Sequence, residues 1–249
     1  MRWIGYLLVV FSLTVATGCT QNIDLGPDEH QVSELETFDV VSTRRMANKT
    51  AESAVEVINP FAGRGSGTYY KIDGHYVVLT AAHVVHMTEV AFVEGRNDEV
   101  AMGHVVYRDE QNDLAVILIP ELDSRKAMKY KPVSEGDFRG TEVLYTGFPA
   151  RHDLFTAYGR IAGATSQGNL LLHSYAWMGA SGSNIFDTRG RLVGVLYAVD
   201  LGSSPYDPYR VLPPHVVEDV VHVSPVWRLD MDAIVSDIEA CAEGVCRQE

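Results

Sequence analysis

Beyond residue 50, short apolar runs alternate with turn signals at intervals of about ten residues, a spacing typical of all-β proteins. The runs that predict strands lie at 54–58, 67–72, 75–80, 90–93, 100–107, 114–119, 142–146, 155–161, 170–174, 185–186, 191–198 and 216–223. Asp73-Gly74 separates two of these runs, and this dipeptide is a strong hairpin signal. So many short strands predict a sandwich or a pair of barrels.

Three segments depart from this alternation. Residues 230–240 carry their apolar side chains on one helical face, so we expect the chain to close with an amphipathic helix. Residues 20–50 are polar without sustained periodicity, which predicts a tether that can end in a short helix. Residues 200–214 are rich in Gly, Ser, Pro and Tyr and predict a long loop. The expected organisation is a signal peptide at 1–18, a tether at 19–50, a folded domain at 51–225, and a helix and tail at 226–249.

The first residues have the pattern of a secretory signal. Met1 and Arg2 precede an apolar stretch that is shorter than the ~20 residues of a membrane-spanning helix. The following Ala16-Thr17-Gly18-Cys19 resembles a bacterial lipobox, with Ala16 where Leu is usual. This resemblance implies that Cys19 is lipidated and begins the mature chain. We therefore expect an exported lipoprotein that faces the periplasm or the cell exterior, with a plain cleaved signal or an uncleaved anchor as alternatives.

Composition and charge narrow the class of protein further. Hydrophobic residues make up 46% of the chain and charged residues 21%, which is typical of a globular protein with a sizeable core. The formal net charge of −13, without clustered Lys and Arg, argues against nucleic acid as a partner. Because an exported chain meets oxidising conditions, Cys241 and Cys246 are expected to form a disulfide, with two free thiols as the alternative.

Candidate chemistry lies in three short segments. His83 follows the apolar run 77–79 and two alanines, Asp113 immediately precedes the apolar run 114–118, and Ser181 lies between Ala180 and Gly182. Acyl transfer requires these groups, because a serine hydroxyl is a weak nucleophile until a neighbouring base removes its proton. Histidine titrates near neutrality, and a carboxylate can orient its ring. Each segment alone is a weak signal, but their joint occurrence in this order indicates a catalytic triad.

The glycines around the serine indicate how negative charge would be stabilised. They allow backbone N–H groups to turn toward one point, where a developing oxyanion can be bound. The expected donors are the backbone N–H groups of Gly179 and Ser181.

Together the three segments resemble the trypsin-like (chymotrypsin-fold) serine peptidases, especially their bacterial branch. Thr80-Ala81-Ala82-His83 matches the family's histidine motif, Asn112-Asp113-Leu114-Ala115 its aspartate motif, and Gly179-Ala180-Ser181-Gly182-Ser183 its nucleophile motif. The resemblance extends from about residue 55 to about residue 223. It implies an all-β fold of two antiparallel β-barrels, with an active site between them that needs no cofactor. His83 and Asp113 would then belong to the first barrel and Ser181 to the second.

Two positions depart from the family pattern. Ala180 stands where animal digestive members have an acid that pairs with a freshly cut N-terminus, so activation by that route is not expected. Asn184 replaces a common proline, a change we expect to be tolerated.

Other residues are alternatives for the same roles. Ser174 and Ser183 are alternative nucleophiles, but only Ser181 lies between two nearby glycines, Gly179 and Gly182. Asp109 and Glu110 are nearby acids, but neither abuts the apolar run. His86 forms a His-x-x-His pair with His83, yet no third metal ligand of recognisable spacing follows, so no metal site is expected.

The resemblance also implies where the substrate side chain before the cut (P1) would lie. The pocket would be lined by residues 175–178 and 196–199, with Tyr175, Leu196 and Ala198 as its candidate residues. No acid stands there to pair with a substrate Lys or Arg, which favours an apolar or small P1 residue. His173 is the residue most able to change that preference.

The function expected from these patterns is that of a serine endopeptidase acting on protein or peptide substrates. A catalytically silent lipoprotein of the same fold, serving as a binding module, is the alternative from another class. An esterase with the same groups is a third hypothesis, which peptide and ester substrates would distinguish. No oligomeric state is indicated.

Overall fold

The computed structural model describes residues 40–202 and 215–246, which belong to one compact unit spanning Phe38–Glu249. The expected signal peptide, Cys19, residues 19–39 of the expected tether, and most of the expected loop at 200–214 lie outside the described residues. Within them, neither helix is long and apolar enough to cross a membrane.

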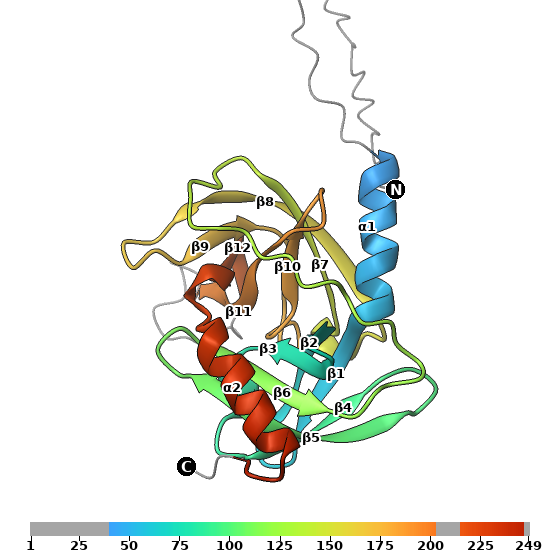
Figure 1. The fold of residues 1–249 in the computed structure, drawn as a ribbon. Coiled ribbons are helices and arrows are strands. Elements are labelled where there is room, and N and C mark those ends of the chain that lie inside the picture. Colours follow the sequence, from blue (N-terminus) through green and yellow to red (C-terminus); the bar gives the residue numbers. More distant parts are fainter. Residues whose placement is uncertain (1–39, 203–214, 247–249) are drawn as a thin grey trace, which may run out of the picture. The chain divides into compact units, whose positions relative to one another are not determined.

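The first half of the folded unit is a closed antiparallel barrel of six strands (Figure 1). Its strands are β1 (Ala54–Asn59), β2 (Gly63–Ile72), β3 (His75–Thr80), β4 (Val90–Glu94), β5 (Val100–Asp109) and β6 (Leu114–Ile119), in the order β1-β2-β3-β6-β5-β4. The β2–β3 hairpin turns at Asp73 and Gly74, which have φ of 46° and 87°. Positive φ at both positions is the geometry for which Asp-Gly is favoured, because it matches the twist of the strands.

The second half repeats this architecture. Its strands are β7 (Glu142–Gly147), β8 (Phe155–Ala164), β9 (Leu170–His173), β10 (Asn184–Asp187), β11 (Leu192–Gly202) and β12 (His215–Pro225), which close in the order β10-β11-β12-β9-β8-β7. The prediction of two antiparallel barrels of the trypsin type is therefore confirmed, and its strands correspond one by one to the twelve apolar runs.

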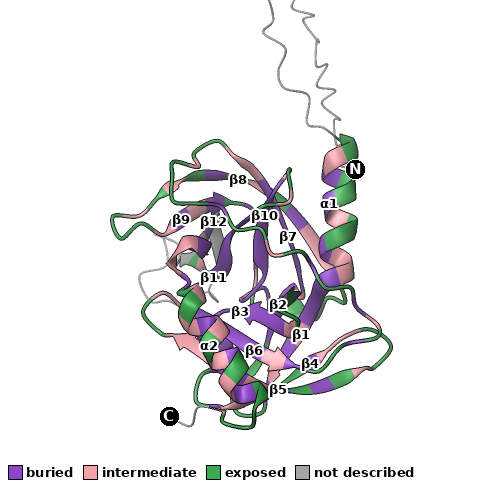
Figure 2. Ribbon diagram, in the orientation of Figure 1, coloured by how far each residue is buried: buried purple, intermediate pink, exposed green. Residues whose placement is uncertain are grey.

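Burial follows the strand period. Alternate residues of β5 from Ala101 to Val105 point into the first barrel, whereas β6 is buried along almost its whole length. When both faces of a strand are covered, its residues do not alternate between buried and exposed positions. Figure 2 shows the buried residues concentrated on the strands of both barrels and on one side of each helix.

Two α-helices flank the barrels. α1 (Val40–Ser53) occupies the end of the expected tether and reaches three residues beyond it. Its buried residues Thr43, Met46, Thr50 and Ser53 recur at helical spacing, and Thr50 Oγ1 is hydrogen-bonded to Thr146 Oγ1 of β7 at 2.6 Å. The last part of the tether is therefore a helix packed against the second barrel.

The closing helix predicted from residues 230–240 is confirmed as α2 (Met231–Ala242), which packs near β5. Asp230 caps its first turn by accepting a hydrogen bond from Ala233 N–H, and Ile234 and Ile238 are buried. The Sγ atom of Cys241, in the last turn of α2, is bonded to that of Cys246, which lies beyond the end of the helix.

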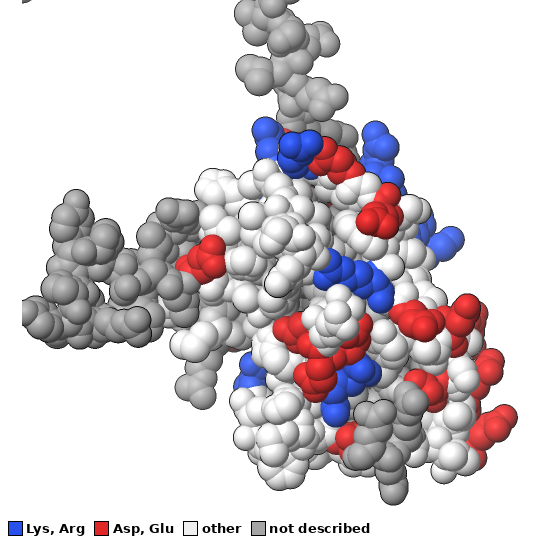
Figure 3. Space-filling view, turned by 90° about the vertical axis from the view of Figure 1, so that its left-hand side faces the viewer, with Lys and Arg blue, Asp and Glu red and all other residues white. Residues whose placement is uncertain are grey.

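On the face of the molecule drawn in Figure 3, acidic and basic side chains adjoin at the top and in the middle, and much of the upper part carries neither. Asp and Glu side chains gather at the lower right of this face, with Lys and Arg only at the margin of that group.

Candidate active site

His83 lies in a short 3₁₀ helix, η1 (Ala82–Val85), directly after β3. Its neighbours Ala82, Val84 and Val85 are buried, so the helix is anchored in the barrel and the His83 side chain, 46% exposed, is turned outward. Asn59 Nδ2 donates to the carbonyl oxygens of Val84 and His86. The apolar run that ends in small residues thus produces a fixed platform for an exposed imidazole.

Asp113 lies in the turn between β5 and β6 and engages His83 twice. Its Oδ2 is 2.7 Å from His83 Nδ1, and its Oδ1 accepts the backbone N–H of His83 at 2.8 Å. Asp113 has φ of 55°, a left-handed conformation that aspartate tolerates better than most residues. A carboxylate against Nδ1 favours the tautomer that carries its proton there, which leaves Nε2 free to accept a proton.

Ser181 lies in a loop that requires its two glycines. Gly179 and Gly182 have φ of 97° and 88°. A Cβ on Gly182 would lie 2.0 Å from the carbonyl oxygen of Ser66, and one on Gly179 would lie 2.5 Å from that of Phe148. Larger residues would therefore clash with backbone as well as adopt an unfavourable φ.

The backbone amides of Gly179 and Ser181 have no acceptor within the described part of the chain. The surrounding amides, by contrast, are used: Ala180 N–H donates to Trp177 O at 2.9 Å, and Gly182 N–H to Leu196 O at 2.7 Å. This turn therefore presents two unoccupied N–H donors on either side of Ala180, which is the arrangement that binds an oxyanion.

The two barrels meet where these loops approach each other. Ser66 N–H on β2 donates to Ser181 O at 2.7 Å, and its Oγ donates to Gly179 O at 2.7 Å. A Cβ on Gly65 would lie 2.6 Å from Val84 Cγ2 and 2.9 Å from Ser181 O. β2 thus lies between the His83 helix and the Ser181 loop and touches both. No hydrogen bond joins Ser181 Oγ to His83 among the residues described, and such bonds are often long in unliganded enzymes.

Asn184 is a site residue whose contacts were not predicted. It is fully buried, its Oδ1 accepts from Tyr70 OH at 2.8 Å, and its Nδ2 donates to Leu79 O and Gly182 O at 3.1 and 3.0 Å. Burial raises the pKa of Tyr70 well above its usual value, so its hydroxyl remains a donor. The side chain that replaces the family's proline therefore connects both barrels to the nucleophile loop. Its departure from the family pattern was the only signal in the sequence.

The three candidate pocket residues do not line one cavity. Leu196 is only 2% exposed and lies in the core, where its backbone braces the nucleophile loop. Tyr175 is exposed and lines a cavity of about 400 Å³ with His173 and Arg160, and neither Leu196 nor Ala198 contributes to it. Ala198 is partly buried on β11. Leu196 cannot offer its side chain to a substrate in this conformation, because the strand packs it inward.

A groove that was not predicted from the sequence adjoins the oxyanion turn. It has a volume of about 490 Å³ and includes Gly179, Phe148, Trp177 and the exposed Met178 in its lining. It shares Arg64 with a neighbouring cavity of about 630 Å³. Residues distant in the chain form this groove together, so no local sequence motif predicts it.

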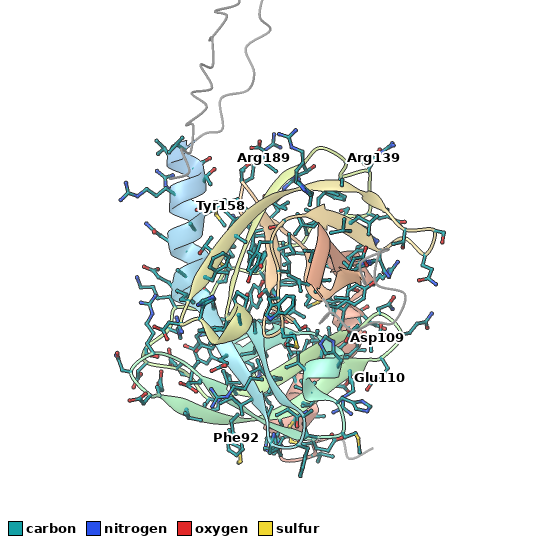
Figure 4. The ribbon with its side chains drawn as sticks, turned by 180° about the vertical axis from the view of Figure 1, so that it is seen from behind. Phe92, Asp109, Glu110, Arg139, Tyr158 and Arg189 are labelled. Carbon is teal, nitrogen blue, oxygen red and sulfur yellow. A yellow bond between two sulfur atoms is a disulfide. The ribbon has the colours of Figure 1, made fainter. Side chains whose placement is uncertain are left out.

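The alternative residues occupy other environments. The buried Ser183 Oγ has no hydrogen-bond partner among described residues, and Ser174 Oγ donates to Tyr158 O. Asp109 accepts the N–H groups of Gln111 and Asn112 in the turn that precedes Asp113. His86 Nδ1 is 3.5 Å from Glu110, and residues 40–202 and 215–246 contain no group of three side chains placed to hold a metal ion. Figure 4 shows Asp109 and Glu110 side by side on this turn.

The model of the trypsin-like peptidase domain family matches residues 65–195, which is more than half of the chain. No curated protein matches the sequence.

Solved structures share the fold at low sequence identity. A serine endoprotease from Yersinia pestis is similar with a TM-score of 0.61 and 22% identity, and the match covers 79% of this chain and 66% of that one. The Rv3671c protease of M. tuberculosis, in an inactive form, is similar with a TM-score of 0.59 and 17% identity, over 80% of this chain and 95% of that one. The family match over residues 65–195, which include all three candidate triad residues, establishes that this chain belongs to the trypsin-like peptidase domain family.

Proposed function

We propose that this protein is a serine endopeptidase in which His83, Asp113 and Ser181 form the catalytic triad. The observation that carries the proposal is the double hydrogen bond between the Asp113 carboxylate and His83, combined with the two unoccupied amides of the Ser181 loop. A binding module gains nothing from orienting an exposed imidazole in this way.

The chemistry follows from these groups. His83 Nε2 removes the proton from Ser181 Oγ, which attacks the carbonyl carbon of the substrate. The N–H groups of Gly179 and Ser181 stabilise the oxyanion, and the protonated His83 then delivers its proton to the leaving amine. Water, activated by His83, releases the acyl group from Ser181. These steps are those of the serine peptidase triad in the trypsin-like family, to which this chain belongs.

The P1 preference is proposed to be for apolar or small side chains. The support is the segment 175–178, which carries Tyr, Ala, Trp and Met and no charge, whereas Leu196 packs inward and does not offer its side chain. Digestion of a peptide library, with the new termini read by mass spectrometry, tests this preference. Cleavage mainly after Lys, Arg, Asp or Glu would contradict it.

We also propose that Cys19 carries a lipid that holds the mature chain at a membrane. Growth of a producing bacterium with tritiated palmitate should label the wild-type chain. The Cys19→Ser variant should lose the label and leave the membrane fraction. Label that persists in the variant would contradict this anchor.

Labelling with a fluorophosphonate probe tests the catalytic proposal without a known substrate. The probe reacts with activated serines, and we expect one adduct on Ser181, which mass spectrometry can map. Ser181→Ala should abolish the adduct. Ser183→Ala is the matched control, because its buried hydroxyl has no described partner and its loss should leave labelling unchanged. A folded wild-type chain without an adduct would favour the silent binding module.

A further inference from the structure

The turn that carries Asp113 belongs to the first barrel, but hydrogen bonds from the second barrel hold it. Asn112 precedes Asp113, and its backbone carbonyl accepts the Ser224 hydroxyl of β12 at 2.5 Å. Its side-chain Oδ1 accepts Arg228 Nη1 at 3.1 Å. The residue next to the candidate catalytic acid is thus fixed through both its backbone and its side chain.

Arg228 connects this turn to two further points of the second barrel. It closes the short helix η3 (Val226–Arg228) after β12, and its guanidinium donates to Asn169 Oδ1 at 2.5 Å and to Gln167 O at 2.6 Å. Both acceptors lie in the β8–β9 turn, where Gly168 has no side chain and a Cβ would lie 3.0 Å from Arg228 Nη2. A planar, permanently charged fork can hold several acceptors at fixed angles, which a flexible ammonium cannot.

The same network extends to Tyr197 on β11. Asn169 Nδ2 donates to Tyr197 OH at 2.8 Å. Burial raises the pKa of Tyr197, the bond from Asn169 lowers it, and the negative charge of Asp113 raises it again.

We infer that Arg228 is a positioning residue for the Asp113–His83 pair, acting through Asn112, the neighbour of Asp113. Asp113 and His83 belong to one barrel and Ser181 to the other. The alignment of His83 with Ser181 therefore depends on how the Asp113 turn packs against the second barrel. Displacement of a reacting group by about 1 Å can slow a reaction by about 10²-fold. Arg228 opposes such displacement. This inference rests on the proposed triad.

The test compares the kinetics of fluorophosphonate labelling, which separate the maximal labelling rate from the probe concentration at half-maximal rate. Arg228→Met keeps an unbranched side chain of similar length and removes the donors. We expect its maximal rate to fall by about tenfold or more, with the half-maximal concentration changed by less than about twofold. Arg228→Lys keeps the positive charge but lacks the planar guanidinium, so its maximal labelling rate should lie between those of Arg228→Met and wild type.

Arg139→Met is the matched control. Arg139 is an exposed arginine paired with Asp137, and Figure 4 shows it at the end of the second barrel, away from the Asp109–Glu110 turn. Its loss should leave the labelling rate unchanged.

A second comparison distinguishes positioning from a general structural role. In an Asp113→Asn background, Arg228→Met should lower the maximal rate by less than about twofold, because the group it acts through is already impaired. An undiminished effect in that background would contradict the inference. If Arg228→Met does not fold, Arg228→Lys and Asn169→Ala carry the test, and both should be slower than wild type.

The outcomes also separate this inference from the proposed function. A wild-type chain that the probe does not label contradicts both. A labelled wild type, together with a folded Arg228→Met variant of equal rate, contradicts the positioning role alone.

Discussion

At the scale of single residues, the Asp113–His83 contact is the feature on which catalysis is expected to depend. Asp113→Asn keeps the size of the side chain but presents an amide to His83 Nδ1, which favours the wrong tautomer. Replacing the triad aspartate by asparagine in a trypsin-like enzyme lowers turnover by about 10⁴-fold, and we expect a loss of that order here. The fluorophosphonate labelling rate measures it, and a loss of less than about tenfold would contradict the assigned role.

Asn184 is the residue whose loss should affect stability most directly. Asn184→Leu leaves Tyr70 OH, Leu79 O and Gly182 O without their buried partner. Each buried polar group without a partner costs about 1–3 kcal/mol, so we expect the free energy of unfolding to fall by at least ~3 kcal/mol. Urea unfolding measures the change. Asn48→Leu, on the exposed side of α1, is the control, and its free energy of unfolding should stay within about 0.5 kcal/mol of that of wild type. Equal stability of the two variants would show that the buried network contributes little.

At the scale of elements, α1 should behave as part of the folded domain. Met46 is 5% exposed, and its Sδ lies 2.9 Å from the position of a Cβ on Gly190, in the β10–β11 turn. Met46→Ala should therefore lower the free energy of unfolding by about 2 kcal/mol or more. Met87→Ala removes the same side chain at a position 78% exposed and should change stability little. If both variants unfold alike, the helix does not contribute to the core.

At the scale of the whole molecule, buried tyrosines should make the fold sensitive to alkali. Burial raises the pKa of Tyr69 and of Tyr130 to about 12, and that of Tyr70 well above its usual value. These groups stay protonated in the folded chain, whereas in the unfolded chain they ionise near pH ~10. Their contribution to the free energy of unfolding is fully present below about pH 10 and is lost as the pH rises toward about 12.

Two signals followed together during alkaline titration check this expectation. The last part of the rise in tyrosinate absorbance, which the buried hydroxyls contribute, should coincide with the loss of the circular dichroism signal between about pH 10 and 12, because these hydroxyls ionise as the chain unfolds. Full ionisation of the tyrosines while the circular dichroism stays native would contradict their protonated, buried state.

The sequence by itself predicted the strands, and its resemblance to the trypsin-like peptidases implied the two barrels and the roles of the three candidate catalytic residues. Each apolar run encodes a strand through its own period, and His83, Asp113 and Ser181 stand in local motifs next to such runs. The Asp73-Gly74 hairpin was predictable for the same reason, since its turn type depends on two adjacent residues. Local conformational preference was sufficient for the strands and for this hairpin.

Tertiary structure alone decided the rest, because it depends on contacts between residues distant in the chain. The bonds of Asn184 to Tyr70 and Leu79 cross between barrels, and those of Arg228 join three separate turns. The inward packing of Leu196 follows from the pairing of β11 with β12. A sequence period indicates that a strand exists, whereas the side chains that meet across two barrels are set only when the barrels have closed and packed together.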